Sequence, residues 1–156
     1  GCGSDATFLK DIGTRIHEGV GIDEFVTKSK RGNITTDQVR LTHSLPFPDN
    51  RFDVVTLLAV LEHLEDDLSI LREAGRVLKP GGRLVITMPS KAAQPVLEFL
   101  AYKLHLVSEY QIRDHKRYYN RQDLLELIDN VEALSVENHK YFQFGFNNRL
   151  ECIKSH

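Results

Sequence analysis

The sequence predicts an α/β protein with a doubly wound, mostly parallel sheet and helices on both faces. Three observations predict this class. Largely apolar runs at 52–58 and 84–88 are typical of central parallel strands. Segments with helical spacing alternate with these runs. A Gly-rich turn opens the chain directly before a helical pattern, where such folds have a ligand-binding turn. With 156 residues, the chain is long enough for one domain, so we predict a single domain over residues 1–156.

The first third of the chain predicts two helices and two strands. Residues 5–17 are predicted to be helical because Leu9, Ile12 and Ile16 recur on one face, with Ser4 as the N-cap. A short buried strand follows at 19–22 and ends at Asp23-Glu24. We then expect a short helix over 24–31 and a strand over 37–41.

The remaining elements follow from capping residues, breakers and apolar periodicity. After the strand at 52–58, Asp66 or Asp67 should cap a helix that Pro80-Gly81-Gly82 ends. A second central strand is predicted at 84–88 and a helix at 93–106. The last elements are a helix capped by Asn120, and two strands within 133–153 that connect near Gly145.

Charge and composition argue against several functional classes. Twenty Lys and Arg residues face 22 Asp and Glu residues, for a net charge of -2, which favours neither nucleic acid nor a membrane surface as a partner. No apolar stretch approaches the ~18 residues of a transmembrane helix. Cys2 and Cys152 show neither a disulfide framework nor metal-ligand spacing. We therefore expect a cytoplasmic protein.

The opening turn and a later aspartate together suggest a nucleoside ligand. Gly1-x-Gly3-x-x-Ala6 fits the dinucleotide fingerprint, in which bare backbone N–H groups approach a polar ligand. Asp23 follows at about the ~20 residues expected of an acid that binds ribose hydroxyls. Taken singly, a short Gly turn or an aspartate after a strand is a common solvated feature. Their combination at this spacing favours the nucleoside.

Three blocks resemble the class I S-adenosylmethionine-dependent methyltransferases, and most closely the branch called methyltransferase type 11. The blocks are Leu45-Pro46-Phe47-Pro48-Asp49-Asn50-Arg51-Phe52-Asp53-Val54-Val55, Val60-Leu61-Glu62-His63-Leu64, and the segment from Leu71 to Ile86 that contains Leu78-Lys79-Pro80-Gly81-Gly82. They occur in the order and spacing of that family, and the resemblance extends from Gly1 to about Leu127. It implies a Rossmann-like fold and S-adenosylmethionine as the cofactor. A nicotinamide dehydrogenase fits less well, because the chain leaves no room for a substrate domain.

The resemblance also implies which residues contact the cofactor. Gly1, Cys2 and Gly3 would lie against its methionine part, Asp23 with Glu24 beside it would hold the ribose hydroxyls, and Ala59 would face the methionine moiety. Many relatives bind the adenine amine with an acid that here is absent at Leu41-Thr42, so this contact would fall to the backbone near Thr42 or to Ser44. Asp5 stands in place of the family's third glycine.

Two histidines are candidates for the reaction itself. His63 lies just past a predicted strand end and can act as a general base, or it is a structural residue at a helix start. His115 lies in the stretch from Tyr110 to Tyr119, which in the family often closes over the acceptor, although a solvated loop is the alternative. Glu62-His63 resembles a pair at the metal site of ubiquinone-type O-methyltransferases. Their earlier acid is replaced by Ala59, so we predict no metal.

In the family, a first strand precedes the glycines at the centre of the sheet, and here the chain begins on the turn. We therefore expect a first strand to be missing, which would expose ladder edges and invite pairing with a second copy of the chain. The predicted function is methyl transfer from S-adenosylmethionine to a small-molecule acceptor. The alternative is a catalytically inactive methyltransferase-like domain that serves in binding or assembly.

Overall fold

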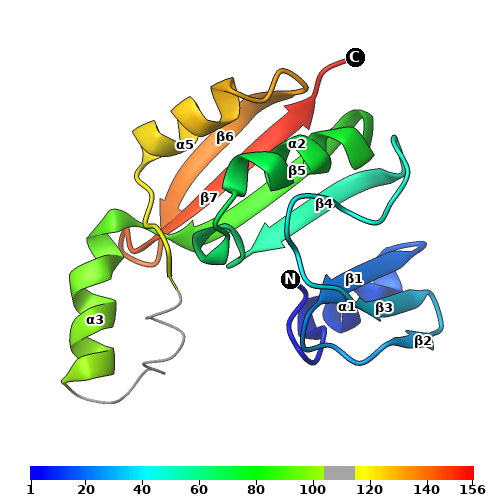
Figure 1. The fold of residues 1–156 in the computed structure, drawn as a ribbon, viewed down its shortest axis with the longest axis horizontal. Helices are drawn as coiled ribbons and strands as arrows, with labels where there is room; N and C mark the ends of the chain where they lie inside the picture. Colours follow the sequence, from blue (N-terminus) through cyan, green and yellow to red (C-terminus); the bar gives the residue numbers. More distant parts are fainter. Residues whose placement is uncertain (104–114) are drawn as a thin grey trace. The chain divides into compact units, whose positions relative to one another are not determined.

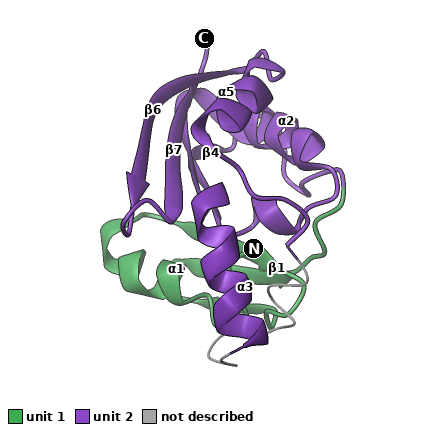
Figure 2. Cartoon of the chain, turned by 90° about the vertical axis from the view of Figure 1, so that its left-hand side faces the viewer, with its two compact units in different colours: residues 1–42 green, residues 43–156 purple. Residues whose placement is uncertain are grey.

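The computed structural model describes residues 1–103 and 115–156, which form two compact units, residues 1–42 and 43–156 (Figure 2). Both units combine helices with strands (Figure 1), which confirms the α/β class. The described strands form two mixed sheets rather than one mostly parallel sheet, because β2 (Ser29–Arg31), β6 (Leu134–Phe142) and β7 (Asn147–Lys154) pair antiparallel with their neighbours. The end of the helix predicted at 93–106 and the first half of the 110–119 stretch lie outside the described residues.

The first unit is a three-stranded sheet with one helix. Its elements are α1 (Thr7–Ile12), the 3₁₀ turn η1 (Gly13–Arg15), β1 (Gly19–Asp23), β2 (Ser29–Arg31) and β3 (Ile34–Gln38). The strand order is β1-β3-β2, with β1 parallel and β2 antiparallel to β3. The strand that ends at Asp23 is confirmed, and so is a helix at the start of the chain. This helix is shorter than predicted, and its N-cap is Ala6, without a side-chain cap, rather than Ser4.

Two further predictions in this unit were wrong. The segment 24–31 contains no helix and instead ends in β2, and the following strand begins at Ile34 rather than at Asp37. Gly32 has φ +60°, which allows a tight turn that folds β2 back onto β3. The hydroxyls of Ser29 and Thr36 share a hydrogen bond of 3.0 Å across this pair. Long-range pairing thus decided the conformation of a polar segment whose local pattern was weak.

The second unit is a four-stranded sheet with order β4-β5-β7-β6. Its elements are β4 (Phe52–Leu58), η2 (Leu61–His63), α2 (Asp67–Val77), β5 (Leu78–Pro89), η3 (Lys91–Ala93), α3 (Gln94–Tyr102), α5 (Arg121–Asp129), β6 (Leu134–Phe142) and β7 (Asn147–Lys154). Strands β4 and β5 are parallel, whereas β7 pairs antiparallel with both β5 and β6. Helices α2 and α5 cover the same face of this sheet (Figure 1).

Both predicted helix caps are present in the second unit. The Asp66 carboxylate accepts a hydrogen bond of 3.0 Å from the Ser69 N–H at the start of α2. Asn120 and Asp123 form a reciprocal capping box at the start of α5, with bonds of 3.0 and 2.7 Å. These caps satisfy N–H groups that a helix leaves unpaired, so local sequence was sufficient to locate both helix starts.

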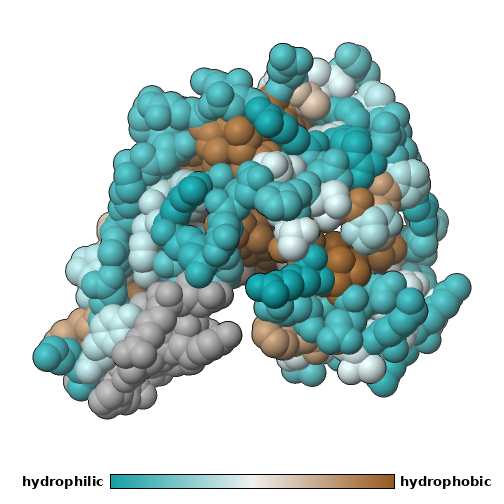
Figure 3. All heavy atoms as spheres, in the orientation of Figure 1, coloured by the Kyte–Doolittle hydropathy of each residue, from teal (hydrophilic) through white to brown (hydrophobic). Residues whose placement is uncertain are grey.

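The core of this unit forms where β5 meets α2. Leu84, Ile86 and Met88 alternate along β5 and are at most 1% exposed, and Ile70 and Leu71 of α2 are completely buried. In the space-filling view, hydrophobic atoms gather between α2 and α5, whose outer surfaces are mainly hydrophilic (Figure 3). In the described part of the chain, no helix is both long and apolar enough to cross a bilayer.

Leu84→Ala should lower the free energy of unfolding by about 2–5 kcal/mol, because it leaves a cavity at a fully buried position of β5. The matched control is Val54→Ala on β4, where the side chain is 54% exposed and the loss should be less than about 1 kcal/mol. Urea unfolding followed by circular dichroism measures both. Equal losses for the two variants would contradict this assignment of the core.

Candidate functional site

The predicted glycine turn and the predicted ribose acid lie together in the first unit. The Cys2 N–H donates to the Ile22 carbonyl (3.0 Å), and the Gly3 N–H donates to Asp23 Oδ2 (2.9 Å). The other carboxylate oxygen of Asp23 accepts from the Phe25 N–H (3.0 Å). Asp23 therefore connects the turn before α1 to the end of β1, twenty residues along the chain.

The backbone of this turn leaves open space beside Gly3. Gly3 has φ +71°, and a Cβ added there would meet no atom within 4 Å. Gly21 on β1 is the opposite case, because an added Cβ would lie 2.7 Å from Leu9 and 2.9 Å from the Cys2 sulfur. Burial, with a smaller contribution from the Asp23 charge, raises the pKa of the Cys2 thiol. The turn is thus packed on its inner side and open on its outer side.

The other predicted cofactor residues are exposed. Glu24, which follows Asp23, forms an ion pair with Arg40, in which Arg40 Nε lies 3.8 Å from Glu24 Oε2. Thr42 is the last residue of the first unit, and Ser44 and Ala59 belong to the second. Ala59 directly follows β4 and has φ +52°, which costs energy for a residue other than glycine and is most frequent at functional sites.

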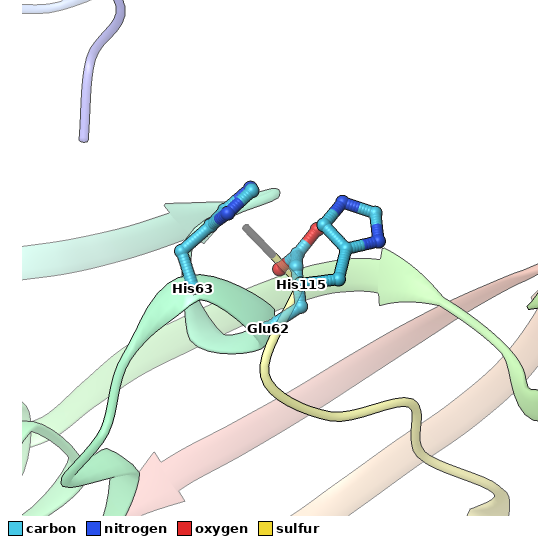
Figure 4. Close-up of side chains that lie close together, drawn as sticks. All are labelled: Glu62, His63 and His115. Atoms are coloured by element: carbon cyan, nitrogen blue, oxygen red, sulfur yellow. The ribbon is translucent and has the colours of Figure 1, made fainter. Parts of the chain in front are cut away.

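The two predicted catalytic histidines lie side by side in the second unit. His63 lies in η2, which follows the carboxyl end of β4, and His115 comes from a segment about fifty residues further along the chain. Their ring centroids are 4.8 Å apart. The Lys116 N–H donates to the Glu62 carbonyl (2.7 Å), which fixes the two segments together. Figure 4 shows both rings and the Glu62 carboxylate on the same side of the η2 turn.

Glu62 is the member of this cluster that the sequence analysis did not select. It is only 1% exposed, and its Oε2 atom has no hydrogen-bond partner within residues 1–103 and 115–156. Burial raises the pKa of the Glu62 carboxyl, an effect that its backbone hydrogen bonds and His63 partly offset. The available signal was its position between Leu61 and Leu64, both buried, where a carboxylate is unusual.

A buried carboxylate at the start of α2 holds the segment that carries His115. Asp67 Oδ2 accepts hydrogen bonds of 2.6 Å from both Arg117 and the Tyr119 hydroxyl. Burial, together with this bond to Asp67, raises the pKa of Tyr119. The Tyr118 hydroxyl contacts His115 Nδ1 at 3.0 Å. Residues 115–119 are therefore fixed by side-chain bonds on both sides of Lys116.

Comparison with known proteins gives the class. A family model described as "Methyltransferase domain" matches residues 1–86, more than half of the chain. The ubiquinone/menaquinone biosynthesis C-methyltransferase UbiE of Vibrio parahaemolyticus is 35% identical over 138 residues, which cover 79% of this chain and 52% of that protein. The chain belongs to this methyltransferase domain family.

Several solved structures share the fold of this chain. An S-adenosylmethionine-dependent methyltransferase from Mesorhizobium loti aligns with 99% of this chain and 88% of its own, with a TM-score of 0.71 and 15% identity. The Haloferax volcanii complex of the Trm112 methyltransferase activator with a putative methyltransferase gives a TM-score of 0.74, at 17% identity, over 100% of this chain and 80% of that one. The chain spans about half or less of the length of the curated relatives it matches.

Tyr119→Phe should lower the free energy of unfolding by about 1.5–3 kcal/mol, since it removes a buried hydrogen bond to a charged group. The control is Tyr141→Phe, because that hydroxyl is bonded to the Arg121 N–H on a side chain that is 48% exposed. Chemical denaturation measures both. If Tyr119→Phe costs no more than Tyr141→Phe, the Asp67 cluster does not hold this segment.

Glu62→Gln should make stability depend less on pH. Because the pKa of Glu62 is raised in the folded state, the stability it contributes is complete below its ordinary pKa of 4.5 and is lost as pH rises through the raised value. Each pH unit between the two values costs about 1.4 kcal/mol. Among the described residues, His63, His115 and Tyr118 are titratable groups close to Glu62.

The measurement is the difference in melting temperature between Glu62→Gln and the parent, from pH 4 to 8 in chelator-treated buffer. The melting temperature of Glu62→Gln should increase relative to that of the parent as pH rises. Glu65→Gln, at an exposed position two residues after His63, is the matched control, and its difference from the parent should change less than that of Glu62→Gln. A constant difference for Glu62→Gln would mean that Glu62 is solvated.

Proposed function

We propose that this protein is an S-adenosylmethionine-dependent methyltransferase that acts on a small-molecule acceptor. The observation that carries the proposal is the Gly1–Gly3 turn, bonded through the Gly3 N–H to Asp23 at the end of β1, in a chain of the methyltransferase domain family. The relatives named UbiE, whose names give a C-methyltransferase of quinone biosynthesis, support a small organic acceptor.

The residues of the turn fit an adenosyl cofactor. Asp23 is half-buried, and each of its oxygens has accepted one backbone N–H and retains a further lone pair for a ribose hydroxyl. The space beside Gly3 admits the close approach of a ligand to the backbone. We propose that Gly1, Cys2 and Gly3 bind the methionine part and that Asp23, with Glu24, binds the ribose. Thr42, Ser44 and Ala59 remain proposed contacts.

When bound, the cofactor supplies a methyl group that is already electrophilic, so the protein must mainly orient the acceptor and manage one proton. We propose that His63 and His115 line the acceptor position and that one of them takes the proton that the acceptor loses. The contact between their rings and the neighbouring Glu62 carboxylate support this role, since a carboxylate stabilises a protonated imidazole.

We further propose that residues 1–156 act as one domain. The alignment of solved methyltransferases with 99–100% of the chain supports this. The free thiols of Cys2 and Cys152 support a cytoplasmic location. Association into a homodimer through exposed strand edges remains a proposal, supported by the positions of β1 and β4 at the edges of their sheets.

Asp23→Ala should weaken the binding of S-adenosylhomocysteine by about 1.5–3 kcal/mol, which is roughly 10- to 150-fold in Kd. The control is Asp37→Ala, which removes a half-exposed aspartate from the adjacent strand β3 and should leave Kd unchanged. Isothermal titration calorimetry measures both. If the protein binds neither S-adenosylmethionine nor S-adenosylhomocysteine at millimolar concentration, the proposal fails.

Methyl transfer is tested separately with radiolabelled S-adenosylmethionine and a panel of small phenols, quinols, amines and carboxylates. Transfer above the buffer blank supports the enzyme. Cofactor binding without transfer to any acceptor would favour the inactive binding module.

A further inference from the structure

We propose that Glu62, His63 and His115 form a binding site for a divalent transition-metal ion of the zinc class. Each residue offers one ligand atom, and the three atoms lie within 4.8 Å of one another. Two of the residues come from the η2 turn after β4 and the third from the segment before α5 (Figure 4). The topology therefore brings together a ligand set that no stretch of the sequence contains.

The strongest support is the environment of the Glu62 carboxylate. Its Oε2 atom is buried and has no hydrogen-bond partner in the described part of the chain. A buried carboxylate oxygen without a partner is costly, and native proteins rarely leave one unless an ion or a ligand completes it. A bound cation would supply the missing interaction, because it offsets both the charge and the lost hydration of the carboxylate.

The ligand types select the metal. Two imidazoles and one carboxylate form a typical zinc set, whereas Mg²⁺ and Ca²⁺ prefer oxygen ligands alone. A zinc ion with three protein ligands keeps a fourth position for water or for another oxygen or nitrogen ligand. Bonds of about 2.0–2.1 Å to one ion require the three ligand atoms to move closer together than they are here. Binding of the metal would therefore include a rotation of the half-exposed His63 and His115 rings toward the carboxylate.

The surroundings of the cluster orient His115 for this role. Its Nδ1 atom contacts the Tyr118 hydroxyl at 3.0 Å. Metal-binding histidines commonly donate one ring N–H to such an oxygen and bind the metal through the other ring nitrogen. Here that nitrogen is Nε2. The bond from the Lys116 N–H to the Glu62 carbonyl keeps the two chain segments in register.

This proposal replaces the prediction of no metal that the sequence suggested. That prediction considered only residues close to Glu62 in the chain, where Ala59 offers no ligand. The structure brings in His115 from a distant segment instead. Metal binding can be measured without the cofactor or an acceptor, so this proposal does not depend on methyl transfer. It is an alternative to the proton-accepting role proposed above, because an imidazole that ligates a metal has no lone pair left for a proton.

The test is a zinc titration of chelator-treated protein against a competing fluorescent chelator. We expect one equivalent of Zn²⁺ per chain. His63→Gln, His115→Gln and Glu62→Gln should each weaken binding by about tenfold or more. His17→Gln removes an exposed histidine of the first unit and should leave the affinity unchanged. Co²⁺ in place of Zn²⁺ should give the visible absorption bands of a four-coordinate site, and His63→Gln should abolish them.

Circular dichroism of each variant separates loss of metal from loss of fold, and His63→Gln, at a half-exposed position, should remain folded. The proposal is overturned if no single equivalent binds, or if folded His63→Gln and His115→Gln bind zinc as tightly as His17→Gln. Zinc binding without methyl transfer would support the metal site and would count only against the proposed reaction.

Discussion

The buried carboxylate of Asp67 is the interaction on which the second unit's site depends. Asp67 sits in the first turn of α2, where the Leu68 N–H donates to its Oδ1 atom (2.8 Å). Its Oδ2 atom binds Arg117 and Tyr119. Because these two residues follow His115 closely, the same carboxylate that lies at the start of α2 also places His115 beside η2. A charge buried to this degree is stable only when paired and hydrogen-bonded, as it is here.

The strand β5 supports the segment that carries His115. It pairs with β4 on one side and with β7 on the other, and its alternate residues form the core under α2. Just beyond its carboxyl end, Ser90 pairs with Tyr119, whose carbonyl also accepts from the Lys91 N–H (3.2 Å). The segment that carries His115 is thus fixed by the backbone at one end of β5 as well as by Asp67. This explains how three side chains from two distant segments are held at one place.

In the first unit, too, a carboxylate joins two chain segments at the candidate site. A single carboxylate, Asp23, bonds the glycine turn to the end of a parallel strand. In each unit, part of the candidate site lies at the carboxyl end of a parallel strand, because Asp23 is the last residue of β1, and Glu62 and His63 lie in η2 just after β4. This is where α/β folds generally place their ligands, because the strand ends there and the loops that follow are free to present polar groups. The position of these residues and the family membership therefore point to the same function.

The sequence by itself determined the α/β class, the starts of α2 and α5, and the selection of the glycine turn and Asp23 as candidate ligand-binding residues. Those features rest on local signals: apolar periodicity, capping residues and a fixed spacing. Only the tertiary structure decided three others. Residues 29–31 became a strand because β3 offered a partner, and the neighbouring positions carried no strong pattern of their own. Glu62 proved to be buried and unpaired, which depends on what packs around it. His63 and His115 met because the chain returns to η2 through contacts far apart in sequence, and no local propensity encodes such a return.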